Sequence, residues 1–212
     1  MKFNFFLLVF TCCILMISKD LKSQVPVAQP NATYLQVASY DTNLVFGTLK
    51  LYDDFIYGEA SFSSATVVFG GTSYLNSGSV SHLIYKMDTL GNVIWARQVE
   101  GSGASDFGFM TNDLQHHIYV GGHFDNDITV QGQTMSSAGL NDIAVIKFDS
   151  SGNLLSLHKW GGILNDTCFG LAIDYAQNYF MWMTNAGNYS LPAPPVSSKA
   201  LIFLKLDSSW NE

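Results

Sequence analysis

The side chains most suited to chemistry crowd into one stretch near the middle of the chain. His116, His117 and His123 lie close together there, and His117 and His123 share a face if the segment is a β-strand. Neutral imidazole is a common metal ligand, so this spacing suggests a metal site. The equivalent positions one sequence repeat earlier, however, hold Asp54 and Ser61 in place of His116 and His123. We therefore interpret the histidines as variation at the entrance of a strand.

A second candidate is the run Asp125-Asn126-Asp127, whose oxygen-rich side chains are similar to the start of a calcium-binding loop. Calcium prefers several carboxylate and carbonyl oxygens from one short loop, with glycine at the sixth position and glutamate at the end. The sixth position here is Val130, and the terminal glutamate is missing. The run therefore predicts a hairpin turn and not a calcium site.

Three lysines recur at matching places, and each stands two residues before an aspartate. Lys86, Lys147 and Lys205 would form a ring of positive charge if they lined a channel. Residues two apart on a strand face the same way, so we expect each lysine to extend along apolar surface and to pair locally, for example with that aspartate.

The sequence predicts no catalytic residue, no metal ligand and no cofactor site. It has no Gly-x-Ser-x-Gly nucleophile motif, and none of its glycine-rich segments opens a helix as a phosphate-binding loop does. Cys168 lies beside Phe169 in an apolar segment predicted to be a buried strand, where a thiol is usually unreactive.

An internal repeat of about sixty residues must position these side chains. Two unrelated markers keep this period, and a third accompanies them in the first two units. The first marker is Lys86-Met87-Asp88, Lys147-Phe148-Asp149 and Lys205-Leu206-Asp207; the second is Phe46-Gly47, Phe107-Gly108 and Phe169-Gly170; the third is Gly91-Asn92 and Gly152-Asn153. Such self-similarity is typical of propellers, solenoids and arrays of small domains.

Each unit is a series of short strands separated by turn residues, with no convincing helix, so we predict an all-β fold. The strand 143–148, which carries Lys147, is apolar on both faces and therefore needs neighbours on both sides. The predicted strands are 55–62, 66–69, 83–87 and 93–99 in the first unit, and 107–112, 117–124, 128–130, 143–148 and 154–160 in the second.

Composition and charge narrow the functional classes. Of the 212 residues, 48% are hydrophobic and 13% are charged, which is typical of a chain that buries a core. The formal net charge is −7 at pH 7, and so acidic a chain is repelled by phosphate backbones and by anionic lipid. We therefore expect no nucleic-acid partner.

Residues 1–23 have the pattern of a secretory signal peptide. Lys2 precedes a nearly uninterrupted apolar run at 3–17, and a polar stretch follows to Ser23. The run is shorter than the roughly 18 residues that a membrane-spanning helix needs, so we expect no membrane span after the peptide is removed. The protein is predicted to be secreted or held at the cell surface.

The cysteines agree with a fold that is stabilised by packing. Cys12 and Cys13 would leave with the signal peptide, and Cys168 alone permits no internal disulfide.

Several motifs in order support a resemblance to a known family. They are 69–72 (Phe-Gly-Gly-Thr), 91–95 (Gly-Asn-Val-Ile-Trp), 118–124 (Ile-Tyr-Val-Gly-Gly-His-Phe) and 142–149 (Asp-Ile-Ala-Val-Ile-Lys-Phe-Asp). Over about residues 41–209 the chain resembles the secreted β-propeller-repeat proteins of the Bacteroidetes, whose repeats occur in surface proteins exported by type IX secretion. The chain departs from the family pattern at Ser81, Ser156, Ala200 and Trp210, where the pattern has Asp, Trp, Asp and Gly.

The resemblance implies β-propeller repeats with about three blades in this chain. We assign a signal peptide to 1–23, a linker to 24–40, and blade-like repeats to 41–103, 104–162 and 163–212, the last truncated at a hairpin. Propellers close with about 4 to 8 blades, so the propeller is incomplete in this chain, and we expect an N-terminal fragment of a longer protein. Alternatively, the three repeats assemble with other copies through unpaired edge strands.

Two functions are compatible with these features. The first is a non-catalytic extracellular scaffold or binding module whose loops contact an unidentified extracellular protein or glycan. The second is an accessory domain of a longer extracellular enzyme, glycan-degrading or proteolytic. An enzyme should show carboxylates or a nucleophile that break the repeat, whereas the loops here mostly repeat Gly, Ser, Asn and Thr, so we favour the first.

Overall fold

The computed structural model describes residues 40–185 and 200–211, and these contain fifteen β-strands and no helix. The predicted all-β fold is therefore confirmed. The predicted signal peptide lies outside the described residues, as does all of the predicted linker except Tyr40. No helix within the described ranges is long and apolar enough to cross a membrane.

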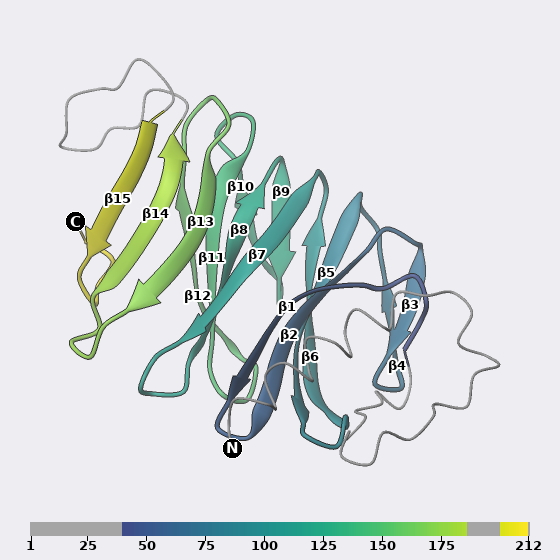
Figure 1. Cartoon of the computed structure of the whole chain (residues 1–212). Helices are drawn as coiled ribbons and strands as arrows, with labels where there is room; N and C mark the ends of the chain where they lie inside the picture. The colour runs from purple at the N-terminus through teal and green to yellow at the C-terminus, as the bar shows by residue number, and fades with distance from the viewer. Residues whose placement is uncertain (1–39, 186–199, 212) are drawn as a thin grey trace, which may run out of the picture.

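The three sequence units form three antiparallel sheets built on one plan (Figure 1). In each of the first two units, four long strands pair with their neighbours in the order in which they occur in the sequence. A small hairpin separates the second long strand from the third along the chain. The first sheet contains β1 (Val45–Tyr52), β2 (Phe55–Phe62), β5 (Val80–Asp88) and β6 (Val93–Gly101); the second contains β7 (Ser105–Asn112), β8 (Ile118–Phe124), β11 (Asp142–Phe148) and β12 (Leu154–Trp160); the third contains β13 (Thr167–Ile173), β14 (Tyr179–Asn185) and β15 (Ala200–Leu206).

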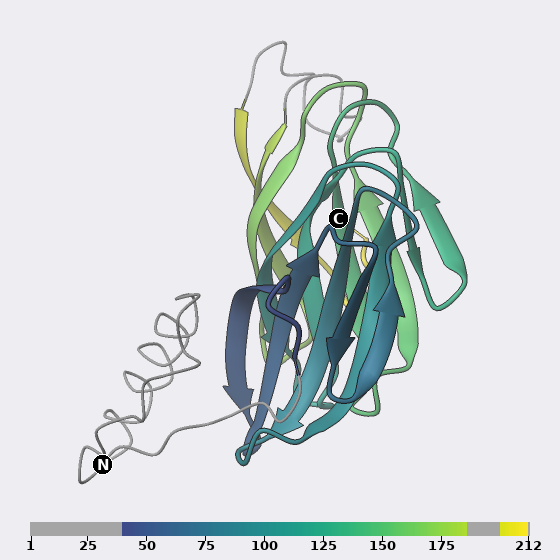
Figure 2. The ribbon, with the colours of Figure 1, turned by 90° about the vertical axis from the view of Figure 1, so that its right-hand side faces the viewer.

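The sheets stack face to face, which Figures 1 and 2 show from two directions. One apolar core fills the space between the first and second sheets, and another fills the space between the second and third. A third core lies on the opposite face of the first sheet. The first and second sheets therefore each have a core on both faces, whereas the third sheet, within the described residues, has a core on one face only.

The lysine-bearing strands β5 and β11 are buried on both faces, as predicted, whereas β15 is buried on one face only. Ala144 and Ile146 belong to the core shared with the first sheet, whereas Ile143 and Val145 belong to the core shared with the third. All four side chains are 0% exposed. Full burial of one such aliphatic side chain contributes about 1.5–3 kcal/mol, so stacking is the main source of stability.

Two small hairpins leave the sheets between their second and third long strands. β3 (Thr66–Phe69) pairs with β4 (Thr72–Leu75), and β9 (Asp127–Val130) pairs with β10 (Gln133–Ser136). Both close through two residues with positive φ, Gly70-Gly71 and Gln131-Gly132, as tight hairpins require. β9 also pairs with β6, which joins the second unit to the outer strand of the first sheet.

Most predicted strands lie within a few residues of the observed ones, but four strands were missed. β1, β4, β10 and β14 were not predicted, and β4 and β10 are only four residues long. The hairpin turn predicted at Asp125-Asn126-Asp127 is wrong. Asn126, with φ 55°, makes a bend between β8 and β9, which belong to different sheets.

A recurring turn closes the strand pairs and explains the third sequence marker. In the turn after β11, Asp149 Oδ1 accepts hydrogen bonds from the N–H groups of Ser151 (2.9 Å) and Asn153 (2.8 Å), and Asp149 Oδ2 accepts one from Asn153 Nδ2 (2.8 Å). Gly152 lies between them with φ 78°. The same contacts recur in the turns that begin at Asp88, Asp174 and Asp207.

One of these turns also connects the second sheet to the first through a tryptophan. Trp95 on β6 donates a hydrogen bond from Nε1 to the carbonyl of Ser150 (3.1 Å) in the turn of the second sheet. A Cβ on Gly152 would lie 2.7 Å from Trp95 Cδ2, so glycine makes room for the ring.

The second and third sheets meet through an equivalent contact, but there the large residue lies in the turn and the small residue lies on the strand. Ser156 stands where Trp95 stands in the first sheet, and Trp210, with φ 65°, replaces the turn glycine. The Trp210 ring reaches back and stacks on Tyr179 at 3.9 Å and on His158 at 4.1 Å between centroids. The two departures from the family pattern therefore compensate each other.

Gly152→Ala should destabilise the protein more than Gly132→Ala. The two glycines have φ of 78° and 80°, so either alanine strains the backbone by about 1–2 kcal/mol. Only at position 152 does the new methyl group also collide with Trp95, because Gly132 has open space around it. Urea unfolding of both variants measures the difference, and equal losses would show that the Trp95 contact is not tight.

Candidate functional site

The structure separates the three histidines considered as metal ligands. His116 Nδ1 pairs with Asp53, and His117 Nδ1 pairs with Asp113, whereas His123 lies on β8 opposite Asp106. Within 40–185 and 200–211, no three His, Cys, Asp or Glu side chains are grouped as metal ligands would be.

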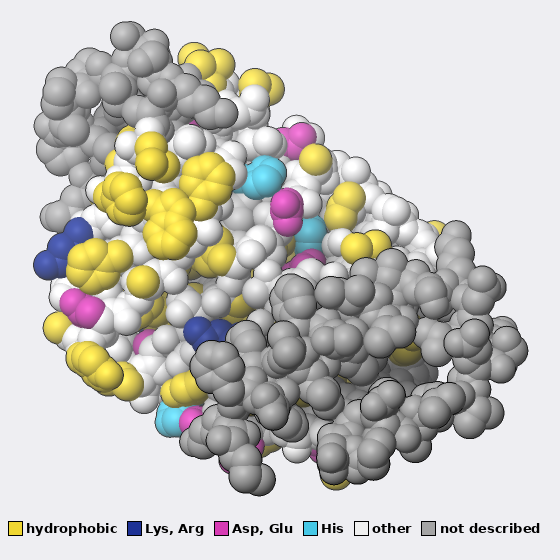
Figure 3. Space-filling model, in the orientation of Figure 1, with side chains coloured by type: hydrophobic (Ala, Val, Ile, Leu, Met, Phe, Trp, Pro, Cys, Tyr) yellow, Lys and Arg dark blue, Asp and Glu magenta, His cyan; other side chains and the backbone are white. Residues whose placement is uncertain are grey.

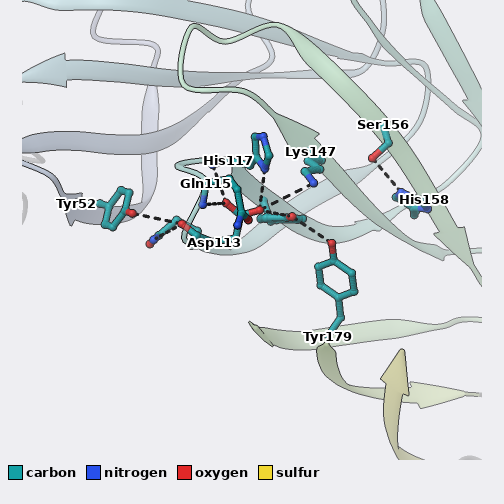
Figure 4. A network of polar contacts seen from close by, with 10 residues as sticks. Tyr52, Asp113, Gln115, His117, Lys147, Ser156, His158 and Tyr179 are labelled. Carbon is teal, nitrogen blue, oxygen red and sulfur yellow. Dashed lines mark hydrogen bonds and ion pairs between the residues drawn. The ribbon is translucent and has the colours of Figure 1, made fainter. Parts of the chain in front are cut away.

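A buried polar network surrounds Asp113, whose side chain is 0% exposed (Figure 4). Asp113 Oδ1 accepts hydrogen bonds from the N–H groups of Gln115 and His117, both at 2.9 Å. Its Oδ2 accepts one from Tyr119 Oη at 2.8 Å and lies 2.8 Å from His117 Nδ1. This is the recurring aspartate turn with His117 in the place of asparagine.

The Asp113 network connects all three sheets. Tyr52 on β1 donates a hydrogen bond to the Asp113 carbonyl at 3.3 Å, and the hydroxyl groups of Tyr119 and Tyr179 lie 3.2 Å apart. Burial opposes ionisation of Asp113, but the hydrogen bonds from Tyr119 and His117 outweigh it and lower the pKa of the carboxyl group. Because its acceptors are occupied, we interpret the network as structural.

The expected pairing of each lysine with the aspartate two residues later is wrong. Asp88 and Asp149 accept hydrogen bonds within their own turns. Lys147 Nζ instead lies 3.9 Å from Asp113 Oδ2, and Lys86 Nζ lies 4.0 Å from the centre of the Phe55 ring. The lysine stems do extend along aromatic surface as predicted, because the opposite residue on the second strand of each sheet is aromatic.

Cys168 is buried, as the sequence predicts, with 6% of its surface exposed. Burial raises the pKa of its thiol to about 12, so the group is protonated at neutral pH. It is therefore a packing residue of the core between the second and third sheets.

A cavity of about 840 Å³ lies beside β6, lined in part by Trp95, Arg97 and Ser150. The guanidinium group of Arg97 already forms hydrogen bonds within the protein. Its Nε donates to the carbonyl of Gly152 at 2.7 Å, and its Nη2 donates to the carbonyl of Ser151 at 3.1 Å. These contacts fix the first sheet to the turn of the second and leave few free donors for a ligand.

A different group of polar side chains has a geometry suited to chemistry, and the sequence analysis missed it. His82 on β5 lies between Glu59 on β2 and Ser105 at the start of β7. His82 Nδ1 is 2.7 Å from Glu59 Oε1, and His82 Nε2 is 2.9 Å from Ser105 Oγ. A carboxylate, an imidazole and a hydroxyl in this order form the arrangement that activates a serine nucleophile.

The surroundings of this group are largely closed to solvent. His82 is 2% and Glu59 is 5% exposed, while Ser105 is partly exposed. The Phe107 ring meets the imidazole edge to face at 4.9 Å between centroids. Burial raises the pKa of Glu59, and the hydrogen bond and charge of His82 act in the opposite direction.

One sequence signal could have found this group. Glu59 and His82 are the polar residues of strands whose neighbours are mostly apolar, and the repeat offers a direct comparison. Gly121 stands at the place of Glu59 in the second sheet, and Ile143 stands at the place of His82. Ser105 carried no signal, since it lies in a run of small loop residues.

Comparison with known proteins adds no relative. A scan against protein-family models finds no match for this chain, and a search of curated proteins finds none either.

Asp113→Ala should lower the free energy of unfolding by about 2–4 kcal/mol, because it leaves the buried Tyr119 hydroxyl and turn N–H groups without their acceptor. Asp174→Ala is the matched control, since it removes the same turn contacts from an exposed site and should have a smaller effect. Thermal and urea unfolding provide the comparison. Equal losses would contradict a special role for the buried network.

The free energy of unfolding should fall in mild acid because of His158. Burial, with a contribution from Lys147, lowers the pKa of His158 to about 4 from an ordinary value of 6.5. The unfolded chain therefore takes up a proton that the folded chain resists, and stability falls as the pH drops from about 6.5 towards 4. His158→Phe keeps the stacking on Trp210 and should flatten the melting temperature over this range. An unchanged pH dependence would exclude His158 as its source.

Proposed function

We propose that the three sheets are blades of a β-propeller and that the protein is a secreted or cell-surface scaffold or binding module. Three features support the propeller. The sheets share one strand plan, they stack through their faces, and the β9–β10 hairpin of one unit extends the outer edge of the preceding sheet. Blades in propellers are packed by other blades on both sides.

The observation that carries the proposal is an exposed apolar face on the third sheet, here called the open face. Figure 3 shows hydrophobic side chains gathered over this part of the molecule. The open face consists of Phe180, Trp182, Leu201 and Phe203, which are 40%, 41%, 61% and 77% exposed. Large contiguous apolar patches on a soluble protein mark interaction surfaces.

The repeat supports one kind of occupant for the open face. Phe203 stands two residues before Lys205, and the residues two before Lys86 and Lys147 are Ile84 and Val145. Ile84 and Val145 are 0% exposed, because the following sheet covers them. The occupant that fits the open face is therefore a further sheet of the same plan.

The signal-peptide pattern supports a role outside the cell, with an extracellular protein or glycan as the partner, and the acidic charge disfavours nucleic acid. The polar turns at the ends of the strands form the faces on which propellers commonly carry their binding loops. A second candidate, a domain of an extracellular enzyme, is favoured by one specific observation, the Ser105–His82–Glu59 group.

The open face should make the isolated chain self-associate. We expect light scattering to show concentration-dependent oligomers, and the variant Trp182→Ser/Phe203→Ser to reduce them together with the binding of a hydrophobic dye. The control is Leu90→Ser/Tyr175→Ser, which changes isolated residues that are 78% and 89% exposed and should have no effect. A wild-type chain that stays monomeric and binds no more dye than the open-face variant would overturn the proposal.

A further inference from the structure

We propose that Ser105 is a nucleophile activated by His82 and oriented through Glu59, and that this group hydrolyses carboxylic esters. The inference is independent of the scaffold role, because it rests on a junction between the first and second sheets and not on the open face. It goes beyond the sequence analysis, which predicted no catalytic residue.

The hydrogen bonds define the tautomer of the imidazole. Among the described residues His82 has one charged partner, Glu59, and a carboxylate accepts, so His82 Nδ1 carries the proton and donates it across 2.7 Å. Nε2 is then unprotonated and accepts the hydroxyl proton of Ser105 across 2.9 Å. Both distances lie within the range in which a base is ready to take up a nucleophile's proton.

The imidazole is held rigidly in this orientation. Phe107 packs against it edge to face, and Glu59 in turn lies over Gly47, where a Cβ would collide with Glu59 Oε2. Glycine at this place on β1 thus leaves the space that the carboxylate fills. The base and its orienting group come from two adjacent strands of one sheet, which fixes their separation.

The rest of the protein shows that the fold does not require polar groups here. The second sheet has Gly121 and Ile143 at these places, and the third has Trp182 and Leu201. Burying an acid and an imidazole in an apolar core is unfavourable unless both are paired. Of the three described sheets, the first alone has an acid and an imidazole at these places, and the second sheet meets them there with the Ser105 hydroxyl.

Ser105 is the residue of this group that solvent reaches. It is partly exposed, whereas its two partners are buried, and the preceding residues 101–104 are Gly, Ser, Gly and Ala. The N–H groups of Gly103 and Ala104 have no hydrogen-bond acceptor among the described residues. Gly103 is buried against the Asp125 carboxylate, so the exposed Ala104 is the candidate donor for the oxyanion that forms when Ser105 attacks a carbonyl.

The reaction balances without a cofactor. Ser105 Oγ attacks the ester carbonyl while its proton passes to His82 Nε2, and Glu59 stabilises the resulting imidazolium. The alcohol leaves with that proton as the acyl-serine forms. Water then attacks the acyl-serine, with His82 again taking and returning one proton, and releases the carboxylic acid.

The test combines a fluorophosphonate probe with the ester p-nitrophenyl acetate. The probe should label the folded protein at Ser105, located by peptide mass spectrometry, and the ester should show a burst of nitrophenol. Ser105→Ala should lose both, with an unchanged circular dichroism spectrum. Ser73→Ala, which removes the hydroxyl of an exposed serine on β4, should behave as wild type.

Glu59→Gln distinguishes activation from simple proximity. It keeps the size of the side chain but removes the charge that stabilises the imidazolium, so labelling should slow at least about tenfold. Three results would overturn the proposal: no labelling of the folded wild-type protein, labelling at another serine, or labelling of Ser105 at the same rate in Glu59→Gln. The oligomeric state is not part of this test, so the scaffold proposal can fail separately.

Discussion

The structure depends on one constraint, which is that the central strands are apolar on both faces. A strand such as β11 has no face that water can cover, so its sheet must be packed on both sides. Stacking of like sheets satisfies this requirement for every internal sheet. The same rule leaves the outer face of the last sheet uncovered, which is why Leu201 and Phe203 are the most exposed of its large hydrophobic strand residues.

Apolar stacking alone does not determine the position of one sheet relative to the next. Specific contacts made by the turns determine it. The aspartate turn after β11 presents backbone carbonyls at a defined place, and the first sheet reaches them with Trp95 and Arg97. At the next junction the large residue sits in the turn itself, as Trp210, and the strand residue is the small Ser156. A large and a small residue meet in both cases, so the junction conserves volume although the sequence positions are exchanged.

The sequence was sufficient for the features that repeat. Strands β2, β3 and β12 were predicted at their observed bounds because turn residues separate them cleanly, and the burial of both faces of β11 followed from its composition. The features that depend on neighbours in space were not predictable. β10 is polar and is defined only by pairing with β9, and Lys147 pairs with Asp113 across the sheet although Asp149 is nearer in sequence. Ser105 joins His82 only because the first and second sheets meet there.

In a repeat protein, equivalent positions of the units can be compared with one another. This comparison distinguishes residues that the fold requires from residues that the fold does not explain. Positions filled by aliphatic or aromatic residues in every unit are explained by packing. Glu59 and His82 are not explained in this way, because Gly121 and Ile143 occupy the equivalent places in a sheet of the same form. A buried acid and base are tolerated only when they form hydrogen bonds with each other. The hydroxyl of Ser105, on the neighbouring sheet, supplies the remaining hydrogen bond of the imidazole. The place where the repeat is broken is therefore the place where chemistry should be sought, and the regular remainder is the frame that holds it.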